Sequence, residues 1–379
     1  MYTETKRVEY LDSIRGLAAL FVLLCHTAKA FEWPPNYVSL LNLPFVYILF
    51  DGKAAVVMFF VLSGYVLSKP YVVSPTTTRK IFLPTFYLRR FMRIWIPWFF
   101  VFLCSLIACK IFFALPTTEP PVTKWWLGKI WLNSFPLSAS DFFRQCAFLL
   151  HDANRQLLPQ DWSLGVELKG SALIPLFLFL AYRQRVYLLF LLATFLLFFV
   201  GTGHYYVSFI IGVLLAQYGD WLSVRFMTVK RSTRIGVLLI GLLLYQAYSV
   251  IVVNLHETPL TLKLGWSITG FGCALIMLSV FSSPTLQRIL NQKAIVLLGR
   301  ISYSIYLIQF IVILCLLLPL LKIINGWGVH QPAIILVFLL LVSVLVTVGC
   351  AALTYRYIEV PTINWGHRLT KKIQSRFQK

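Results

Sequence analysis

The sequence is poor in charged residues, and the shortage falls mainly on the acidic ones. Asp, Glu, Lys and Arg make up 12% of the 379 residues, and only 13 side chains are acidic. A water-soluble domain needs far more polar side chains to cover its surface. The composition therefore excludes a soluble protein. With 59% hydrophobic residues, the lipid bilayer must be the solvent for most of the chain.

Patterns typical of metal-binding or disulfide-bonded proteins are also missing. The seven cysteines show no Cys-x-x-Cys or Cys/His metal-ligand spacing, and only Cys146 lies outside an apolar run. We therefore expect neither a metal site nor a structural disulfide. No segment alternates apolar and polar residues with the period of a membrane-spanning strand, so helices must satisfy the backbone in lipid.

Apolar runs long enough to cross roughly 30 Å of hydrocarbon recur from end to end of the chain. They predict an all-α, polytopic membrane protein, with about ten transmembrane helices around a buried cavity. No soluble domain is appended, so we expect one integral-membrane domain over residues 1–379. The expected spans are 11–31, 50–69, 94–114, 162–182, 186–200, 205–220, 235–253, 266–282, 301–321 and 333–354.

The net charge of +21 has a distribution that explains it without a nucleic-acid partner. If the N-terminus is cytoplasmic, the segments on that side of the spans carry most of the lysines and arginines, as the positive-inside rule requires. This predicts a multi-pass protein of the cell membrane with both termini cytoplasmic and with lipids as its surroundings. It also places residues 115–161, which hold Trp125, Trp126 and Trp131, outside.

The first span carries three ionisable residues, each of which costs about 2.5–3.5 kcal/mol inside a membrane. Arg15 and His26 are close to three helical turns apart, so they share one face at a separation of roughly 16 Å. Asp12 lies one turn before Arg15 and can pair with it structurally. The same three residues argue against reading this stretch as a cleaved signal peptide. Alone, the arginine could be a snorkelling cation and the histidine a packing residue.

A second basic group precedes the third expected span. Arg89, Arg90 and Arg93 are spaced as i, i+1 and i+4 at its cytoplasmic end. They are either membrane anchors, which is the commoner case, or a binding site for a polyphosphate.

Glu167 lies five residues inside the outer end of the fourth span, and His26 lies five residues inside the outer end of the first. Both are thus expected at one depth, roughly 7.5 Å below the outer surface. A carboxylate at that depth can orient the imidazole and stabilise its protonated form. Lys169 is an equally available partner for the carboxylate.

Seven short segments, in this order, resemble the acyltransferase-3 family of membrane O-acyltransferases. Each is weakly specific alone, but together they cover the whole chain. They are Leu11-Asp12-Ser13-Ile14-Arg15-Gly16 followed by His26, Phe59-Phe60-Val61-Leu62-Ser63-Gly64-Tyr65, Arg90-Phe91-Met92-Arg93, Trp162-Ser163-Leu164 with Glu167, Phe209-Ile210-Ile211-Gly212, Ile301-Ser302-Tyr303-Ser304-Ile305-Tyr306-Leu307, and Tyr355-Arg356-Tyr357-Ile358-Glu359-Val360-Pro361.

The resemblance implies an enzyme that modifies polysaccharides by O-acetylation in a bacterial inner membrane. It would move an acyl group, acetyl by default, from cytoplasmic acetyl-CoA or another acyl-CoA to a hydroxyl of an extracytoplasmic or lipid-linked glycan. His26 and Glu167 would be catalytic, with His26 as general base or as the site of an acyl-His intermediate. Donor phosphates would bind four arginines, Arg15, Arg89, Arg90 and Arg93. The acceptor would bind Trp162, Ser163 and Gln309.

The sequence departs from the family pattern at two places that bear on the acceptor. Leu168-Lys169-Gly170 follows Glu167 where acidic, amide or aromatic residues are usual, and Gln309 stands where histidine is frequent. No esterase-like domain of the kind some relatives carry follows, so we expect a stand-alone acyltransferase. The acceptor stays open.

Two other functions compete with acyl transfer. A secondary transporter of an anionic metabolite could use Arg15, His26 and Glu167 as substrate and proton sites, but the matched broken helices of such folds are missing. A membrane subunit without chemistry would leave the ordered motifs unexplained.

Overall fold

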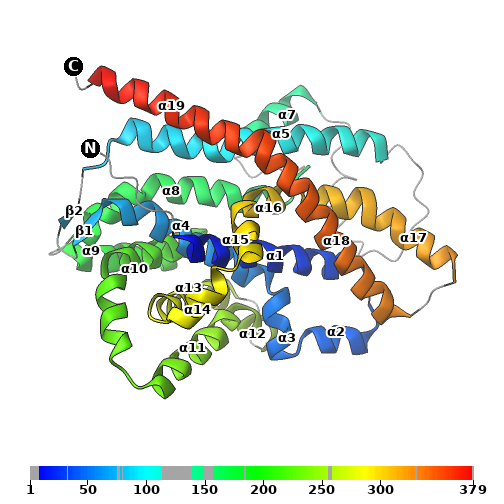
Figure 1. The fold of residues 1–379 in the computed structure, drawn as a ribbon, viewed down its shortest axis with the longest axis horizontal. Coiled ribbons are helices and arrows are strands. Elements are labelled where there is room, and N and C mark those ends of the chain that lie inside the picture. The colour runs from blue at the N-terminus through cyan, green and yellow to red at the C-terminus, as the bar shows by residue number, and fades with distance from the viewer. Residues whose placement is uncertain are drawn as a thin grey trace. The chain divides into compact units, whose positions relative to one another are not determined.

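The protein is described by a computed structural model that covers residues 8–31, 33–74, 77–78, 80–112, 138–147, 157–182, 185–254, 258–328 and 331–377. In this part of the chain the structure is helical apart from a two-stranded antiparallel ribbon (Figure 1). The predicted all-α fold is therefore confirmed. Most of the expected outer segment 115–161, including its three tryptophans, lies outside the described residues.

The chain divides into two compact units, each built from three separate segments. Unit 1 comprises residues 1–18, 53–83 and 169–300, and unit 2 comprises residues 19–52, 84–168 and 301–379. Helices α1 (Glu9–Lys29) and α8 (Asp161–Ala181) each contribute several residues to both units. The prediction of a single domain stays a prediction.

Unit 1 consists of helices and the two-stranded ribbon. Besides the N-terminal half of α1 and the C-terminal part of α8, its elements are α4 (Gly52–Ser68), η2 (Lys69–Tyr71), β1 (Val72–Ser74), β2 (Thr77–Thr78), α9 (Val186–Phe199), α10 (Gly203–Met227), α11 (Arg231–Tyr245), α12 (Ala247–Asn254), α13 (Pro259–Phe281), α14 (Pro284–Leu290) and α15 (Lys293–Arg300).

The described part of unit 2 contains a helix of 30 residues and two π-helical turns. Besides the C-terminal half of α1 and the first residues of α8, its elements are α2 (Pro35–Leu41), α3 (Pro44–Tyr47), η1 (Ile48–Phe50), α5 (Leu83–Phe112), α7 (Ala139–Cys146), α16 (Ser302–Val312), the π-helix η4 (Ile313–Leu317), α17 (Leu318–Gly326), α18 (Pro332–Thr354), the π-helix η5 (Tyr355–Glu359) and α19 (Val360–Phe377).

Within the described residues, eight helical stretches are long and apolar enough to cross a membrane, so the expected count of about ten is not confirmed. The expected span 186–200 is α9, whose 14 residues reach only about 21 Å. The expected span 235–253 is divided between α11 and α12, which meet at Gln246. The eight are Glu9–Lys29, Gly52–Tyr71, Leu83–Phe112, Asp161–Ala181, Gly203–Met227, Pro259–Phe281, Ser302–Gly326 and Pro332–Arg376.

The helix boundaries follow local sequence signals. Thr258 begins α13 as an N-cap whose hydroxyl accepts the backbone N–H of Thr261 at 3.1 Å, and Pro259 occupies the first turn, where no N–H is needed. Pro332 begins α18 in the same way. These signals let helices start abruptly at the ends of apolar runs.

Helix α5 begins eleven residues before the expected span 94–114. The expected boundary followed the apolar run, but the helix continues through the basic residues and reaches back to Leu83. Arg89, Arg90 and Arg93 therefore lie inside the helix, and placing them in a connecting segment was wrong. In Figure 1, α5 and α19 run alongside each other in unit 2, and Arg89 Nε donates to Thr370 Oγ1 of α19 at 3.0 Å.

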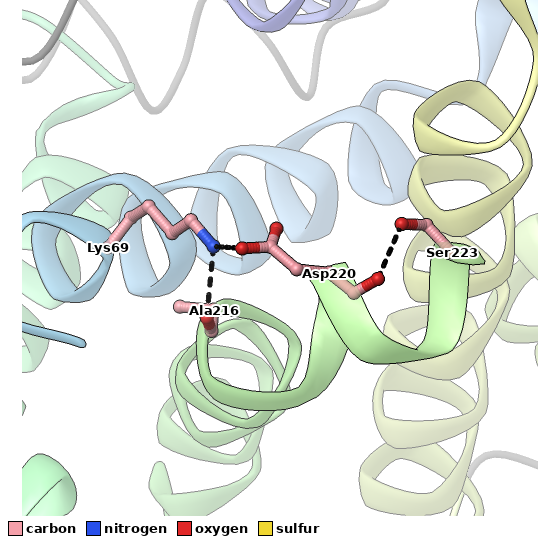
Figure 2. A network of polar contacts seen from close by, with 4 residues as sticks. All are labelled: Lys69, Ala216, Asp220 and Ser223. Carbon is pink, nitrogen blue, oxygen red and sulfur yellow. Dashed lines mark hydrogen bonds and ion pairs between the residues drawn. The ribbon is translucent and has the colours of Figure 1, made fainter. Parts of the chain in front are cut away.

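In unit 1, α4 and α10 approach each other so closely that two glycines are required. A Cβ at Gly212 would meet the carbonyl oxygen of Val61, and a Cβ at Gly64 would meet that of Phe209. In η2, directly after α4, Lys69 Nζ reaches Asp220 Oδ2 of α10 at 2.6 Å (Figure 2). Two of the seven family-like segments, 59–65 and 209–212, thus serve helix packing.

We expect Gly212→Ala to destabilise the protein by roughly 1–3 kcal/mol, because the added methyl group overpacks a backbone contact. Gly349→Ala in α18 is the matched control, since its Cβ would meet nothing within 4 Å. Thermal unfolding in detergent measures both. Equal unfolding temperatures for the two variants would contradict the close α4–α10 contact.

Candidate active site

The ring of His26 is held in unit 2 by two residues of α16. His26 Nδ1 lies 3.0 Å from Gln309 Oε1, and its ring packs against Phe310 with 4.6 Å between ring centroids. The histidine is half-buried near the C-terminal end of α1. Next to it, the hydroxyls of Thr27 and Ser343 lie 2.7 Å apart and join α1 to α18. A half-buried imidazole with a fixed ring plane suits proton transfer.

The side chains of Gln160, directly before α8, and Ser163, in its first turn, form hydrogen bonds to α16. Ser163 Oγ lies 2.5 Å from the Tyr306 hydroxyl and donates to the Gln160 carbonyl at 2.9 Å. The Gln160 amide in turn donates to the carbonyl of Leu307 at 2.8 Å. These groups are buried, so each bond replaces hydration that the site cannot supply.

Glu167 forms an ion pair with Arg90. Arg90 Nη2 lies 2.8 Å from Glu167 Oε1, and the two side chains are 12% and 21% exposed. Our expectation placed the arginine at the cytoplasmic end of its span and the carboxylate near the outer end of its own. The ion pair brings the two charged groups to one level, so that separation was wrong. Depth counting failed because it fixed α5 eleven residues too late.

The three arginines of α5 have different surroundings. Arg89 bonds to α19 through Thr370, whereas Arg90 bonds to α8 through Glu167. Arg93 is half-buried one turn beyond Arg90, on the same face of the helix. The three predicted arginines therefore lie on one helix, but Arg89 and Arg90 bond to two different neighbouring helices.

Two buried carboxylates escaped the sequence analysis as members of the site. Asp161 accepts a hydrogen bond from Trp98 Nε1 at 2.7 Å, and Glu359 accepts one from Ser304 Oγ at 3.0 Å. Both lie within or directly before family-like segments, so the cost of burying a carboxylate could have drawn attention to them. Their partners could not be read from the sequence. Trp162, beside Asp161, is 36% exposed.

Arg15 and Asp12 belong to unit 1, where they form the expected ion pair at 2.7 Å. Arg15 Nη2 also donates to the Gly299 carbonyl near the end of α15 at 3.2 Å. Gly16 and Gly299 allow this approach, because a Cβ on Gly16 would meet the backbone of Gly299. A cation beside the last carbonyls of a helix is favourable. Among the described residues, no group of three or more His, Cys, Asp and Glu side chains is placed to hold a metal ion.

Comparison with known protein families shows to which family the chain belongs. The acyltransferase domain of the acyltransferase-3 family matches residues 8–355. The chain belongs to this family. It is 22% identical over 376 residues to the O-acetyltransferase OatA of Staphylococcus aureus strains NCTC 8325 / PS 47 and COL, covering 93% of this chain and 56% of each relative. The chain thus spans about half the length of these relatives.

The chain matches a larger share of a second relative. The O-acetyltransferase PaAT-1 of Phomopsis amygdali is 26% identical over 358 residues, covering 79% of this chain and 71% of the relative. No solved structure matches the chain.

In this acyltransferase-3 protein, the bonds of unit 2 join segments that are far apart in the sequence. The predicted catalytic residues His26 and Glu167 both lie in this unit. Four bonds of this unit join His26 to Gln309, Arg90 to Glu167, Ser163 to Tyr306 and Ser304 to Glu359.

We expect Arg90→Ala to destabilise the acyltransferase by up to about 3–5 kcal/mol, because it leaves a largely buried carboxylate unpaired. The double variant Arg90→Ala/Glu167→Ala should lose less stability than the sum of the two single variants. Thermal unfolding of the full cycle gives the coupling free energy.

The matched control is the cycle of Lys69→Ala and Asp220→Ala in unit 1. That ion pair is also short, but the Asp220 side chain is 79% exposed (Figure 2). Its coupling should stay below about 1 kcal/mol. An equally small coupling for Arg90 and Glu167 would show that their pair is solvated and contributes no more than a surface contact.

Proposed function

We propose that this protein is a membrane O-acyltransferase. It moves an acyl group, acetyl by default, from cytoplasmic acyl-CoA to a hydroxyl of an extracytoplasmic or lipid-linked glycan. Family membership and the names of the O-acetyltransferase relatives support acyl transfer. The main structural observation in favour of this site is that His26 is half-buried and that Gln309 and Phe310 hold its ring. Family membership also favours an enzyme over a transporter or a subunit without chemistry.

In the proposed reaction His26 acts as a general base. The imidazole takes the proton of the acceptor hydroxyl while the hydroxyl oxygen attacks the thioester carbonyl carbon. The carbon–sulfur bond then breaks, and the CoA sulfur leaves with the proton that the imidazolium returns. The products are an O-acyl ester and free CoA, and His26 is restored for the next turnover.

The donor is assigned to the arginines, because guanidinium groups bind phosphates through two parallel hydrogen bonds. In unit 2 the Glu167 carboxylate neutralises Arg90, which leaves Arg93 as the charge available to a phosphate on that face of α5. We therefore assign Glu167 to holding Arg90 rather than to orienting His26. Arg89, bonded to Thr370 in the same unit, stays assigned to the donor, and the role of Arg15 in donor binding stays a prediction from the sequence.

Burial separates the three residues predicted for the acceptor. Ser163 and Gln309 are 4% and 0% exposed and bond to other protein groups. Such side chains favour a supporting role for the site. Trp162 is 36% exposed, so part of its indole is accessible to a glycan ring, and we assign acceptor contact to it.

His26→Gln should abolish acyl transfer and leave acyl-CoA binding within about twofold, because transfer needs the base and binding does not. Arg93→Ala should do the reverse and weaken acyl-CoA binding by roughly 10- to 150-fold, the loss of one charge-assisted contact of about 1.5–3 kcal/mol. Acceptor-dependent CoA release and calorimetry on purified protein in detergent separate the two effects.

Three results would count against the proposal. Near-normal transfer in His26→Gln would require another base. Unchanged acyl-CoA affinity in Arg93→Ala would return that arginine to membrane anchoring. A burst of CoA equal to the enzyme concentration, without acceptor, would show that His26 becomes acylated and is a nucleophile.

The direction of transfer requires both termini to be cytoplasmic, as the distribution of Lys and Arg predicts. A cysteine at Ser138, the N-cap of α7, should then react with a membrane-impermeant maleimide added to whole cells. A cysteine at Ser232, in the first turn of α11, should react only after permeabilisation. The parent protein corrects for native cysteines. The reverse pattern would place the acyl-CoA arginines on the wrong side for a cytoplasmic donor.

A further inference from the structure

Gln309 is fully buried, and both ends of its side-chain amide have partners. Its Nε2 donates to the carbonyl oxygen of Tyr306 at 3.0 Å, and its Oε1 faces His26 Nδ1 at 3.0 Å. Turning the amide over would set Oε1 against the Tyr306 carbonyl, acceptor against acceptor. An unmade bond in a buried site costs about 1–3 kcal/mol, so the arrangement with Nε2 on the carbonyl wins.

The fixed amide decides which nitrogen of His26 carries the proton. An amide oxygen can only accept, so Nδ1 must be the donor in the bond between His26 and Gln309. A neutral imidazole with its proton on Nδ1 has its lone pair on Nε2. The opposite tautomer would place two acceptors 3.0 Å apart.

We propose that Gln309 is a positioning residue that holds His26 as the Nδ1–H tautomer, so that Nε2 is the atom that takes the proton of the acceptor hydroxyl. This rests on the proposed function for the role of His26, but the tautomer itself does not depend on it. The O–H bond of the acceptor breaks and an N–H bond forms at Nε2. During this step the imidazolium keeps its Nδ1–H bond to the Gln309 oxygen.

The amide is held by more than its own helix. The Tyr306 carbonyl that receives Gln309 Nε2 also receives Gln160 Nε2 at 3.3 Å from the segment before α8. The same tyrosine is fixed at its hydroxyl by Ser163. Because Ser163 gives its one proton to the Gln160 carbonyl, Tyr306 is the donor in that bond. Bonds at both ends of Tyr306 thus hold Gln309 toward His26.

The test reads the tautomer directly by nitrogen-15 NMR of protein with labelled imidazoles, in detergent at neutral pH. The sequence has six histidines, and the pair of signals lost in His26→Gln assigns His26. The expected result for the unaltered protein is a protonated Nδ1 and a bare Nε2. No substrate is needed, so the result stands or falls apart from acyl transfer.

Two substitutions at Gln309 predict opposite outcomes. Gln309→Leu removes the acceptor, so the Nε2–H tautomer should become populated. Gln309→Glu with a protonated carboxyl keeps both bonds, because its O–H donates to the Tyr306 carbonyl and its other oxygen accepts from Nδ1. The Nδ1–H tautomer should therefore persist in this variant. The matched control is Ser343→Ala, which removes a buried bond to the neighbouring Thr27 without touching the ring. It should leave the His26 signals unchanged.

Kinetics then separate positioning from general structural damage. Gln309→Leu should lower kcat at least about tenfold, because most of the enzyme, about nine-tenths for a tenfold loss, then holds its proton on the wrong nitrogen. KM for acyl-CoA should stay within about twofold, and Gln309→Glu should restore most of kcat.

A protonated Nε2, or protons on both nitrogens, in the unaltered protein would overturn the proposal. So would Gln309→Leu with an unchanged tautomer and an unchanged kcat, or a loss of kcat in Gln309→Leu that Gln309→Glu does not reduce. If the unaltered protein showed the Nδ1–H tautomer but transferred no acyl group, the proposed function would fail and the assignment of Gln309 as the residue that fixes the ring would stand.

Discussion

The bonds between the start of α8 and the middle of α16 are the constraint on which the site in unit 2 depends. Polar groups inside an apolar helix bundle cannot turn to water, so each must find a partner in the protein. Gln160 and Ser163 supply those partners to Tyr306 and to Leu307. Once α16 is fixed in rotation by these bonds, the position of Gln309, and with it the ring of His26, follows from helix geometry.

The Arg90–Glu167 pair applies the same principle to charges. An arginine and a carboxylate, each costly in a membrane by itself, are compatible with burial when they meet. Neighbouring arginines of α5 also bond to different helices. Arg90 is committed to α8 and Arg89 to α19, so the helix is held on two sides while Arg93 stays one turn further along.

Much of the fold could be predicted from the sequence, because helical spans depend on apolar runs that composition reveals directly. His26 could be found because an ionisable side chain in such a run is costly. The hydrogen-bond and ion-pair partners of these side chains could not be predicted from the sequence. Helical spacing shows which residues share a face but not which face of another helix lies opposite, so depth alone could not predict that Glu167 pairs with Arg90. The bond from His26 to Gln309 had no signal beyond a departure from the family pattern.

Span boundaries failed for a related reason. The length of an apolar run measures how much of a helix suits lipid, whereas the helix itself ends where backbone bonding ends. In α5 the two differ by eleven residues, and all three predicted arginines fall in that difference. In α9 and α11 the apolar runs were found, but the helices are too short to count as full spans by themselves.

Gln309 has a consequence for how the site responds to the membrane around it. An amide does not ionise, so the histidine and the glutamine that supports it together hold at most one titrating charge. A charge that moves across a membrane gains or loses roughly 2.3 kcal/mol per 100 mV of potential. A carboxylate or a second imidazole at residue 309 would add another such charge and link proton transfer to the voltage and proton gradient. With glutamine at residue 309, the membrane potential acts on no titrating charge other than that of His26 itself in this pair.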